Sequence, residues 1–389
     1  MSGNDVLITG IGLLSSLGEG TDAHWQALGS NAAPRLETEA FAPYTVHPLT
    51  EVDWALQIPR KEQRQMEQWQ RIGTYTAGLA LADAGMKDNE ALTPSMDLIV
   101  AAGGGERDVS VDTQILEASR TRNDRDVMLN EKLTTELRPT LFLAQLSNLL
   151  AGNISIVHQV TGSSRTFMGE EGAGISALQT ALARIRSGQS THILVGGALN
   201  AEHLDVCLSY ELNGLLKRDG WSPLWSRQGC LGGGVVTGSG AAFLVLESRA
   251  HAEGRGARAY AKLAAVSGNQ ASRNGDLEQI ISSVIEDVSP SGADILYSGA
   301  SGAHEAMKAE VSVTPYGTAV RGLTGATGHM KEAQFPFAVA IAALSVSKRE
   351  SLPPLDESHE KAAPKSIDSA LALTVGYHRG EGAALVTKA

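Results

Sequence analysis

Short β-like runs alternate with helical runs along this chain of 389 residues, and this alternation constrains its fold more than any other feature. We expect strands over residues 6–8, 98–102, 154–160, 193–197, 240–248, 294–298 and 382–387. Helices are expected over residues 21–28, 64–84, 140–150, 175–187, 277–288, 303–311 and 331–347. Strands that alternate with helices predict a layered α/β fold.

The composition agrees with this fold class. Glycine occurs 42 times while aromatic residues make up only 5% of the chain, which favours closely packed α/β layers over an all-β sandwich. The pattern of strand and helix restarts after Ser248, so we expect two halves, residues 1–248 and 249–389. Because no linker-like segment separates these halves, they are expected to pack as one body.

Charge and hydropathy exclude several classes of function. The formal net charge is −11 and no basic stripe with interleaved aromatic residues appears, which argues against a nucleic-acid partner. No run approaches the ~18 apolar residues of a membrane span. The chain enters a strand-like run at once in "NDVLITGIG", so no signal peptide is visible. A cytoplasmic protein with reduced Cys207 and Cys230 is therefore predicted.

Two glycine-rich segments suggest ligand binding but lack the residues that it needs. "VLITGIGLLSS" has Gly10-x-Gly12, yet Ser15 takes the third glycine position and no strand with a terminal acid follows about 20 residues on. "LGGGVVTGSGAA" (231–242) lacks the Lys-Ser/Thr pair of a phosphate loop. No Cys or His pairs have zinc spacing. We expect a tight turn at Gly10, a surface turn at 231–242, and neither cofactor nor metal.

The segment "TFMGEEGAGI" (166–175) places two adjacent carboxylates, Glu170 and Glu171, in a glycine-rich turn between a β-like run and a helical run. A Ser or Cys at such a corner would indicate covalent catalysis. A histidine, His329, follows another glycine-rich turn in "TGATGHMKEA" and opens a helical run. Taken alone, this histidine would be interpreted as a core or surface residue without a functional role.

Several segments, in their order along the chain, resemble the β-ketoacyl-acyl-carrier-protein synthases, the condensing enzymes of the thiolase fold. The resemblance covers nearly the whole chain and implies a layered αβαβα architecture with two similar halves. The segments are "VLITGIGLLSSLGEGTDAHWQAL", "LSNLLAGNISIVHQVTGSSRT", "ALARIRSGQSTHILVGGALN", "GSGAAFLVLESRAHAEGRGARAYAKL", "TGATGHMKEA" and "VGYHRGEGAALV".

The catalytic residues of that family are mostly absent here. Its acyl-accepting Cys falls on Glu171, its first His falls on Gly299 with His304 nearby but out of register, and its Lys falls on Thr324. Only the second His is retained, as His329. The C-terminal loop, which in the family helps to form an oxyanion hole, reads Tyr377-His378-Arg379-Gly380.

A carboxylate lacks the reactivity of a thiolate toward thioesters, so the corner is predicted to be inactive in condensation. The resemblance then implies a chain-length factor: a non-catalytic subunit that pairs with an active β-ketoacyl-ACP synthase and shapes its acyl tunnel. The setting would be polyketide, aryl-polyene or fatty-acid-like chain elongation. A malonyl-ACP decarboxylase that supplies starter units is the alternative, and an acid–base role for Glu171 in another reaction is a third reading.

The resemblance also implies where the partner binds. In the family, a strand near the nucleophile pairs across a two-fold axis, and each subunit contributes to the other's acyl tunnel. The matching positions here are Gly104, Asp108, Asp112, Leu141 and Phe142. The expected partners are a catalytic synthase subunit in a heterodimer and an acyl carrier protein, the latter bound mainly through the synthase.

Overall fold

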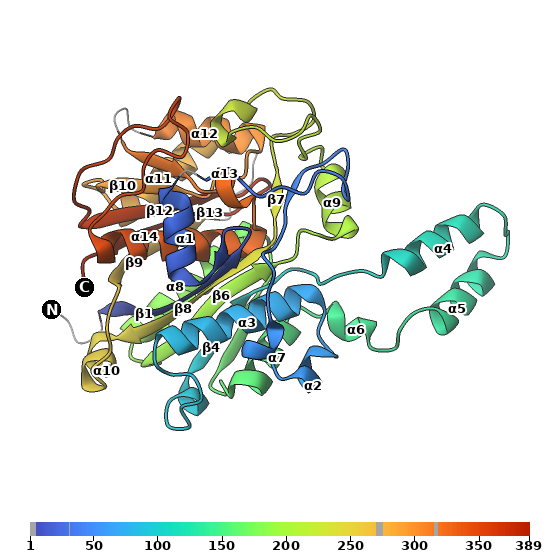
Figure 1. Cartoon of the computed structure of the whole chain (residues 1–389), viewed down its shortest axis with the longest axis horizontal. Coiled ribbons are helices and arrows are strands. Elements are labelled where there is room, and N and C mark those ends of the chain that lie inside the picture. The colour runs from blue at the N-terminus through green and yellow to red at the C-terminus, as the bar shows by residue number, and fades with distance from the viewer. Residues whose placement is uncertain (1–4, 31, 270–274, 315–317) are drawn as a thin grey trace.

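The computed structural model describes residues 5–30, 32–269, 275–314 and 318–389. In these residues the strands form one large mixed sheet in the order β11-β10-β12-β13-β9-β1-β8-β6-β4-β5, with β2 attached to β1 (Figure 1). The strands are β1 (Val6–Ser15), β2 (Gly18–Glu19), β4 (Asp97–Ala101), β5 (Ser164–Phe167), β6 (His192–Leu199), β8 (Gly240–Ser248), β9 (Ala261–Asn269), β10 (Ile295–Ser298), β11 (Val320–Gly322), β12 (Ser369–Val375) and β13 (Glu381–Thr387). A separate pair joins β3 (Val46–His47) to β7 (Thr237–Gly238).

Helices cover both outer faces of the layered structure, and two further helices lie between the strands of the two halves. The helices of the first half are α1 (Gly20–Gly29), α2 (Arg60–Gln63), α3 (Gln68–Asp83), α4 (Val109–Ser119), α5 (Arg125–Thr135), α6 (Leu141–Ala144), α7 (Leu149–His158), α8 (Glu171–Arg186) and α9 (Leu204–Glu211). Those of the second half are α10 (Arg249–Gly254), α11 (Leu277–Val288), α12 (His304–Val313), α13 (Thr324–Thr327) and α14 (Gln334–Lys348). Short 3-10 turns are η1 (Trp54–Leu56), η2 (Thr93–Ser95), η3 (Leu224–Arg227) and η4 (Lys331–Ala333).

The packing gives five layers. Helix α3 covers β1, β6 and β8 on one outer face, while α11 covers β9 and β13 on the other. Helices α8 and α14 lie between, and each contacts strands of both halves. Because α14 is apolar along almost its whole length, with every residue from Gln334 to Val346 buried, it can occupy this central layer. The expected α/β class with layered architecture is thus observed.

The two halves share one sheet through a short antiparallel contact between β1 and β9, at Leu7↔Lys262 and Ile8↔Ala261. Residue 248, the expected boundary, is the last residue of β8, and α10 follows directly. Because α8 lies in the central layer and begins at Glu171, this residue lies in the interior of the fold.

The glycines at the N-terminus differ from the expected turn. Strand β1 continues through Gly10 and Gly12 as far as Ser15. A Cβ at Gly12 would lie 2.2 Å from the Thr76 carbonyl oxygen, and one at Gly10 would lie 2.5 Å from the Ala80 carbonyl oxygen. Both glycines therefore permit close packing of α3 against β1, rather than a turn or a nucleotide site.

The run at 154–160 was expected to be a strand, but the structure places it in helix α7 and the loop that follows. Ile154 lies in the core and Ile156 is exposed, so the apolar residues follow helical burial although β-branched residues favour a strand locally. The strand that precedes the corner is instead β5, a polar segment that alternation did not reveal. The strand β12 was also missed, and the helix expected at 140–150 is divided between α6 and α7.

A helical hairpin of α4 and α5 projects from the body of the molecule (Figure 1). It follows β4 and returns through α6 to α7. Several large apolar side chains on the hairpin and its return are exposed, namely Leu116, Val127, Leu133, Phe142 and Leu146. None of the described helices has the length and apolarity that crossing a bilayer requires.

Candidate functional site

The corner between β5 and α8 has an unusual backbone. Gly169 has φ +125°, and Glu170 has φ +60° with ψ −136°, a conformation that L-residues rarely adopt. Glu171 is the first residue of α8. The chain therefore turns sharply so that the Glu171 side chain, rather than that of Glu170, points into the protein.

Glu171 is completely buried, with 0% of its surface exposed. Its Oε1 atom accepts a hydrogen bond from the Tyr377 backbone N–H at 3.2 Å and lies 2.9 Å from His329 Nε2. The contact with His329 is close but is an ion-pair contact rather than a hydrogen bond, and Nε2 has no hydrogen-bond partner among the described residues. The other carboxylate oxygen, Glu171 Oε2, also lacks one there. The contact is thus electrostatic and gains strength when the imidazole is protonated.

Two further contacts fix His329, one through its backbone N–H and one through its second ring nitrogen, Nδ1. Its N–H donates to the Val236 carbonyl at 2.8 Å, and Nδ1 lies 3.0 Å from the Tyr210 hydroxyl. Burial, with the neighbouring Tyr377 and Glu171, raises the pKa of the Tyr210 phenol well above its usual value. The hydroxyl therefore keeps its proton and can donate it to Nδ1, which leaves the proton of a neutral ring on Nε2, facing Glu171.

Tyr377 fastens the C-terminal loop over the corner. Its hydroxyl donates to Glu170 Oε1 at 2.5 Å, while its backbone N–H reaches Glu171. Burial and the hydrogen bond to Glu170 raise the pKa of the Tyr377 phenol far above its ordinary range. Gly380, with φ +95°, closes the loop, and a Cβ there would lie 2.8 Å from the Gly172 backbone. The loop between Tyr377 and Gly380 thus packs directly on the start of α8.

A further buried carboxylate, Glu332, lies near this cluster. Burial raises the pKa of Glu332, although the neighbouring Lys331 acts in the opposite direction. Lys331 has φ +45° and holds its ammonium 5.2 Å from the centre of the Tyr210 ring. Glu332 was not singled out in the sequence, although its position three residues after His329 in "GHMKEA" places it in the same turn. Among the described residues, no group of three or more His, Cys, Asp or Glu side chains is arranged to hold a metal ion.

The family model described as "Beta-ketoacyl synthase, N-terminal domain" matches residues 3–252, well over half of the chain. This chain belongs to the β-ketoacyl synthase family. Its match begins before β1 and ends in α10, so it includes the corner of Glu171.

Curated relatives are similar to this β-ketoacyl synthase family member at a low level of identity. The 3-oxoacyl-[acyl-carrier-protein] synthase 2 of Vibrio harveyi is 26% identical over 270 residues, 68% of this chain and 62% of that protein. A protein named as an oxytetracycline polyketide β-ketoacyl synthase 1, from Streptomyces rimosus, is 26% identical over 88% of this chain and 84% of its own length. The chain therefore spans less than two thirds of the Vibrio harveyi protein.

Solved structures of the family share the whole fold. A β-ketoacyl synthase from Burkholderia phymatum STM815 superposes with a TM-score of 0.77 at 18% identity, covering 99% of both chains. The ishigamide ketosynthase/chain length factor gives a TM-score of 0.76 at 20% identity, again over 99% of both chains. The thiolase-like ketosynthase fold expected from the sequence is confirmed.

The other positions at which this β-ketoacyl synthase family member departs from the catalytic pattern carry structural contacts. Gly299 has no side chain, and its N–H donates to the Leu373 carbonyl at 2.7 Å. Thr324 is buried and donates its hydroxyl to the Ala300 carbonyl. His304 starts α12, and its Nε2 lies 3.1 Å from the Arg227 carbonyl oxygen. Arg379, in the C-terminal loop, is exposed.

The five expected interface positions lie in the loop after β4, at the start of α4 and on α6, which are the segments that flank the projecting hairpin in the chain. Gly104 is exposed in the loop after β4; Asp108 caps α4, its Oδ1 accepting from the Val111 N–H; and Asp112 pairs with Arg107 at 2.7 Å. On α6, Leu141 is buried in its own chain, whereas Phe142 is 60% exposed. Of the two α6 residues, Phe142 is therefore the one that can reach a partner subunit.

Proposed function

We propose that this chain is a non-catalytic chain-length-factor subunit, which pairs with an active β-ketoacyl-ACP synthase and shapes its acyl tunnel. The observation that carries the proposal is the hydrogen bond from the Tyr377 N–H to Glu171 Oε1. In a condensing enzyme this loop N–H would bind the oxyanion formed from a thioester carbonyl. Here the Glu171 carboxylate accepts the hydrogen bond from this N–H, so the position where a thioester oxygen would bind is occupied by a side chain of the protein.

The thiols of the chain support a non-catalytic role. Cys207 lies buried on α9, where burial raises the pKa of its thiol to about 11, and Cys230 lies in the loop before β7. Burial raises the pKa of Cys230 as well. Neither residue is in the β5–α8 corner, and neither has the lowered pKa that an acyl-accepting thiolate requires.

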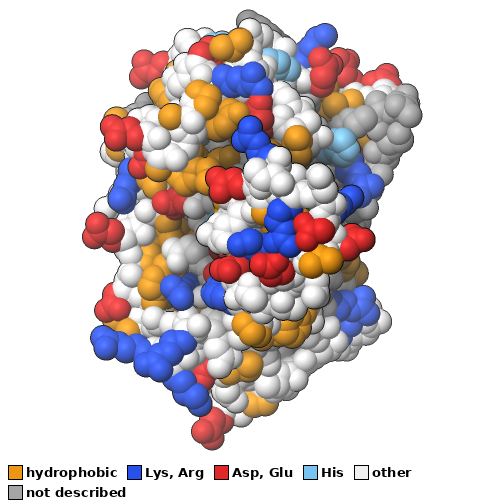
Figure 2. Space-filling view, turned by 90° about the vertical axis from the view of Figure 1, so that its right-hand side faces the viewer, with side chains coloured by type: hydrophobic (Ala, Val, Ile, Leu, Met, Phe, Trp, Pro, Cys, Tyr) orange, Lys and Arg blue, Asp and Glu red, His pale blue; other side chains and the backbone are white. Residues whose placement is uncertain are grey.

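A heterodimer is supported by the edge of the sheet. Strand β5 is the terminal strand of the order and pairs only with β4, so its other edge carries free backbone donors and acceptors in the described structure. Met168 follows it and is exposed, and the projecting hairpin adds the exposed Leu116 and Phe142. Figure 2 views this side of the molecule, where apolar side chains lie among charges of both signs. A synthase subunit seated on β5 would cover these groups.

The relatives indicate the setting. One solved structure of the same fold is a ketosynthase/chain length factor, and another is a type II polyketide acyl-carrier protein in complex with its ketosynthase, with a TM-score of 0.71. Elongation of a polyketide, aryl-polyene or fatty-acid-like chain on an acyl carrier protein is therefore the proposed context. The carrier protein would bind mainly through the catalytic subunit.

The alternative, a malonyl-ACP decarboxylase, is less well supported. That reaction relies on two histidines in the family, and Gly299 stands at the first of these positions. The retained His329 has one nitrogen directed to Tyr210 and the other to Glu171, so its ring is already engaged inside the protein.

The test is co-expression with an intact ketosynthase that carries the Cys and both His residues and is encoded next to this chain. We expect a stable heterodimer by size and mass analysis, elongated products only from the complex, and no carbon dioxide release from malonyl-carrier protein by the isolated chain. Carbon dioxide release by the isolated chain would establish the decarboxylase instead. Elongation by the chain alone would disprove both readings.

A further inference from the structure

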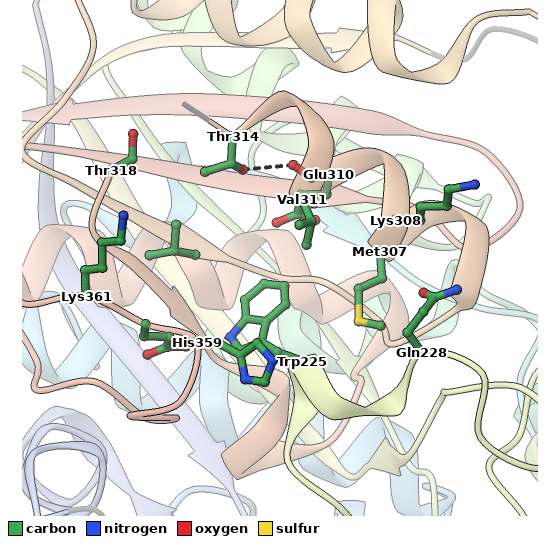
Figure 3. Close-up of a pocket in the computed structure, with 12 residues that line it drawn as sticks. Trp225, Gln228, Met307, Lys308, Glu310, Val311, Thr314, Thr318, His359 and Lys361 are labelled. Atoms are coloured by element: carbon green, nitrogen blue, oxygen red, sulfur yellow. Dashed lines mark hydrogen bonds between the residues drawn. The ribbon is translucent and has the colours of Figure 1, made fainter. Parts of the chain in front are cut away.

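A cavity lies beside β11, at the opposite end of the sheet from β5, and residues of both halves of the chain line it. Its volume is about 490 Å³, within the roughly 300–1,000 Å³ range of small-molecule sites. It is bounded by α12, by the start of β11, by η3 and by the segment around residues 359–361 (Figure 3). Because β11 and β5 are the two terminal strands of the order, this cavity is separate from the Glu171 corner.

The cavity has an apolar wall formed by one face of α12. Met307, Val311 and Thr314 recur at a spacing of four and three residues, so they project from the same side of the helix (Figure 3). Val311 is 56% exposed, although it is a large apolar residue in a helix that otherwise packs on the protein. Val320 and the Trp225 ring complete this apolar surface.

The Trp225 ring is fixed before any ligand binds. Its Nε1–H donates to Glu360 Oε1 at 2.9 Å. The Glu360 carboxylate also accepts from the backbone N–H groups of Gly322 and Leu355, each at 2.7 Å. The acidic group behind the ring is therefore fully occupied by donors, and the ring is held in one orientation against the cavity.

The charged groups at the cavity favour an anion. Lys308 and Lys361 flank it on opposite sides, and both are exposed (Figure 3). The acid in the wall, Glu310, is almost completely buried, and burial raises its pKa to about 7. Near neutral pH this carboxyl thus carries only a fraction of its negative charge. Asp356 also lies near the rim but is close to His359, with Oδ2 3.1 Å from Nδ1.

We propose that this cavity binds an amphipathic anion, which has an apolar chain and one terminal carboxylate or phosphate. The apolar chain would lie along α12 between Val311 and the Trp225 ring, with the anionic end at a flanking lysine. This inference goes beyond the proposed chain-length-factor role and does not depend on it, because it uses no residue of the Glu171 corner or of the β5 edge.

Titration calorimetry of the full chain with decanoate, decyl phosphate, decanol and decyltrimethylammonium tests the proposal. We expect at least one of the two anions to bind with 1:1 stoichiometry. Decanol should bind with an affinity at least about fivefold lower, and the cation should not bind. Because burying one methylene contributes about fourfold in affinity, octanoate, which is two methylenes shorter, should bind roughly fifteenfold more weakly than decanoate. If decyl phosphate binds and decanoate does not, the headgroup is a phosphate.

Two variants locate the site. Val311→Trp fills the cavity from an exposed position and should weaken binding at least tenfold, whereas Val127→Trp on α5 changes an equally exposed valine, 62% against 56%, and should not alter binding. Lys308→Glu should weaken anion binding about threefold and leave decanol unchanged. Absence of saturable anion binding, a preference for decanol or the cation, or equal affinity of the two Trp variants would overturn the proposal. Circular dichroism of each variant identifies any that fails to fold. If Val311→Trp does not fold, the affinity of Lys308→Glu for the anion decides whether the proposal holds.

Discussion

Glu171 Oε1 lies 2.9 Å from His329 Nε2, and both side chains are fully buried. The same oxygen accepts from the Tyr377 N–H, so one carboxylate oxygen joins the corner helix, the histidine turn and the C-terminal loop. These are three segments far apart in sequence that a condensing enzyme uses to surround its thioester. In this chain they surround the Glu171 side chain. The contacts of its carboxylate with His329 and Tyr377 fill the space between the three segments.

The first prediction concerns this carboxylate. Glu171→Gln keeps the shape and an oxygen for the Tyr377 N–H, so the partnered complex should retain its turnover within about threefold. The change removes only the electrostatic contact with His329. The measurement is product formation by the purified heterodimer, compared with the complex of the unchanged chain.

Glu170→Gln is the matched control, since this adjacent carboxylate accepts from the Tyr377 hydroxyl but does not contact His329 in the described structure. Loss of turnover of roughly a hundredfold or more, confined to Glu171→Gln in a complex that still assembles, is the scale of a missing acid–base group. That result would give Glu171 a chemical role.

The second prediction is that restoring a thiol alone does not restore condensation. Glu171→Cys would still have Gly299 and Thr324 where the family has a His and a Lys, and a missing acid–base group costs roughly 10²–10⁴-fold in rate. The isolated variant should form no detectable elongation product when supplied with acyl- and malonyl-carrier protein. Mass spectrometry of the intact protein checks for an acylated Cys, and sustained turnover would mean that the catalytic positions have been misassigned.

The third prediction concerns Glu310, whose pKa burial raises to about 7 from an ordinary value of 4.5. At a pH between these two pKa values, the Glu310 carboxyl is protonated in the folded chain but ionised in the unfolded chain. The free energy of unfolding therefore falls as pH rises through that window. At about 1.4 kcal/mol per pKa unit, the total effect is at most roughly 3 kcal/mol.

Glu310→Gln removes this titration while keeping an oxygen for the Ser298 hydroxyl, which donates to the carboxylate. The free energy of unfolding of the variant, relative to the unchanged chain, should therefore rise by about 2–3 kcal/mol between pH 4.5 and pH 8. Urea unfolding at both pH values measures it. A difference that is constant with pH would show that Glu310 titrates normally.

Much of the architecture could be predicted from local patterns, and the failures have physical causes. Helix α11 has the expected bounds of 277–288 because it is strongly amphipathic on an outer face. The strand before the corner was misplaced, since α7 is β-branched yet helical and β5 is polar at an edge. The resemblance identified Glu171 and His329 and named Tyr377 in the C-terminal loop, and Glu332 follows His329 by three residues. The contacts of Tyr210 with His329 and of Tyr377 with both glutamates are tertiary, so no local pattern reveals them.

The last prediction concerns the loop after β4, where a Cβ at Gly104 would have no heavy atom within 4 Å. A Phe at this position therefore fits the folded chain and adds a ring to the exposed loop. If that position lines the partner's acyl tunnel, the added volume opposes long intermediates, because overpacking of an enclosed space costs about 1–3 kcal/mol. We expect Gly104→Phe to assemble normally and to yield shorter products.

The control is Gly29→Phe at the end of α1, another glycine with no neighbour within 4 Å and placed away from β5. Both variants are co-purified with the synthase, and product length is determined by mass spectrometry. A shift to shorter products for Gly104→Phe alone places this loop in the tunnel, since the two variants add the same ring to the same chain. Unchanged product length in an intact heterodimer would remove Gly104 from the tunnel, and a lost heterodimer would instead place the loop within the subunit interface.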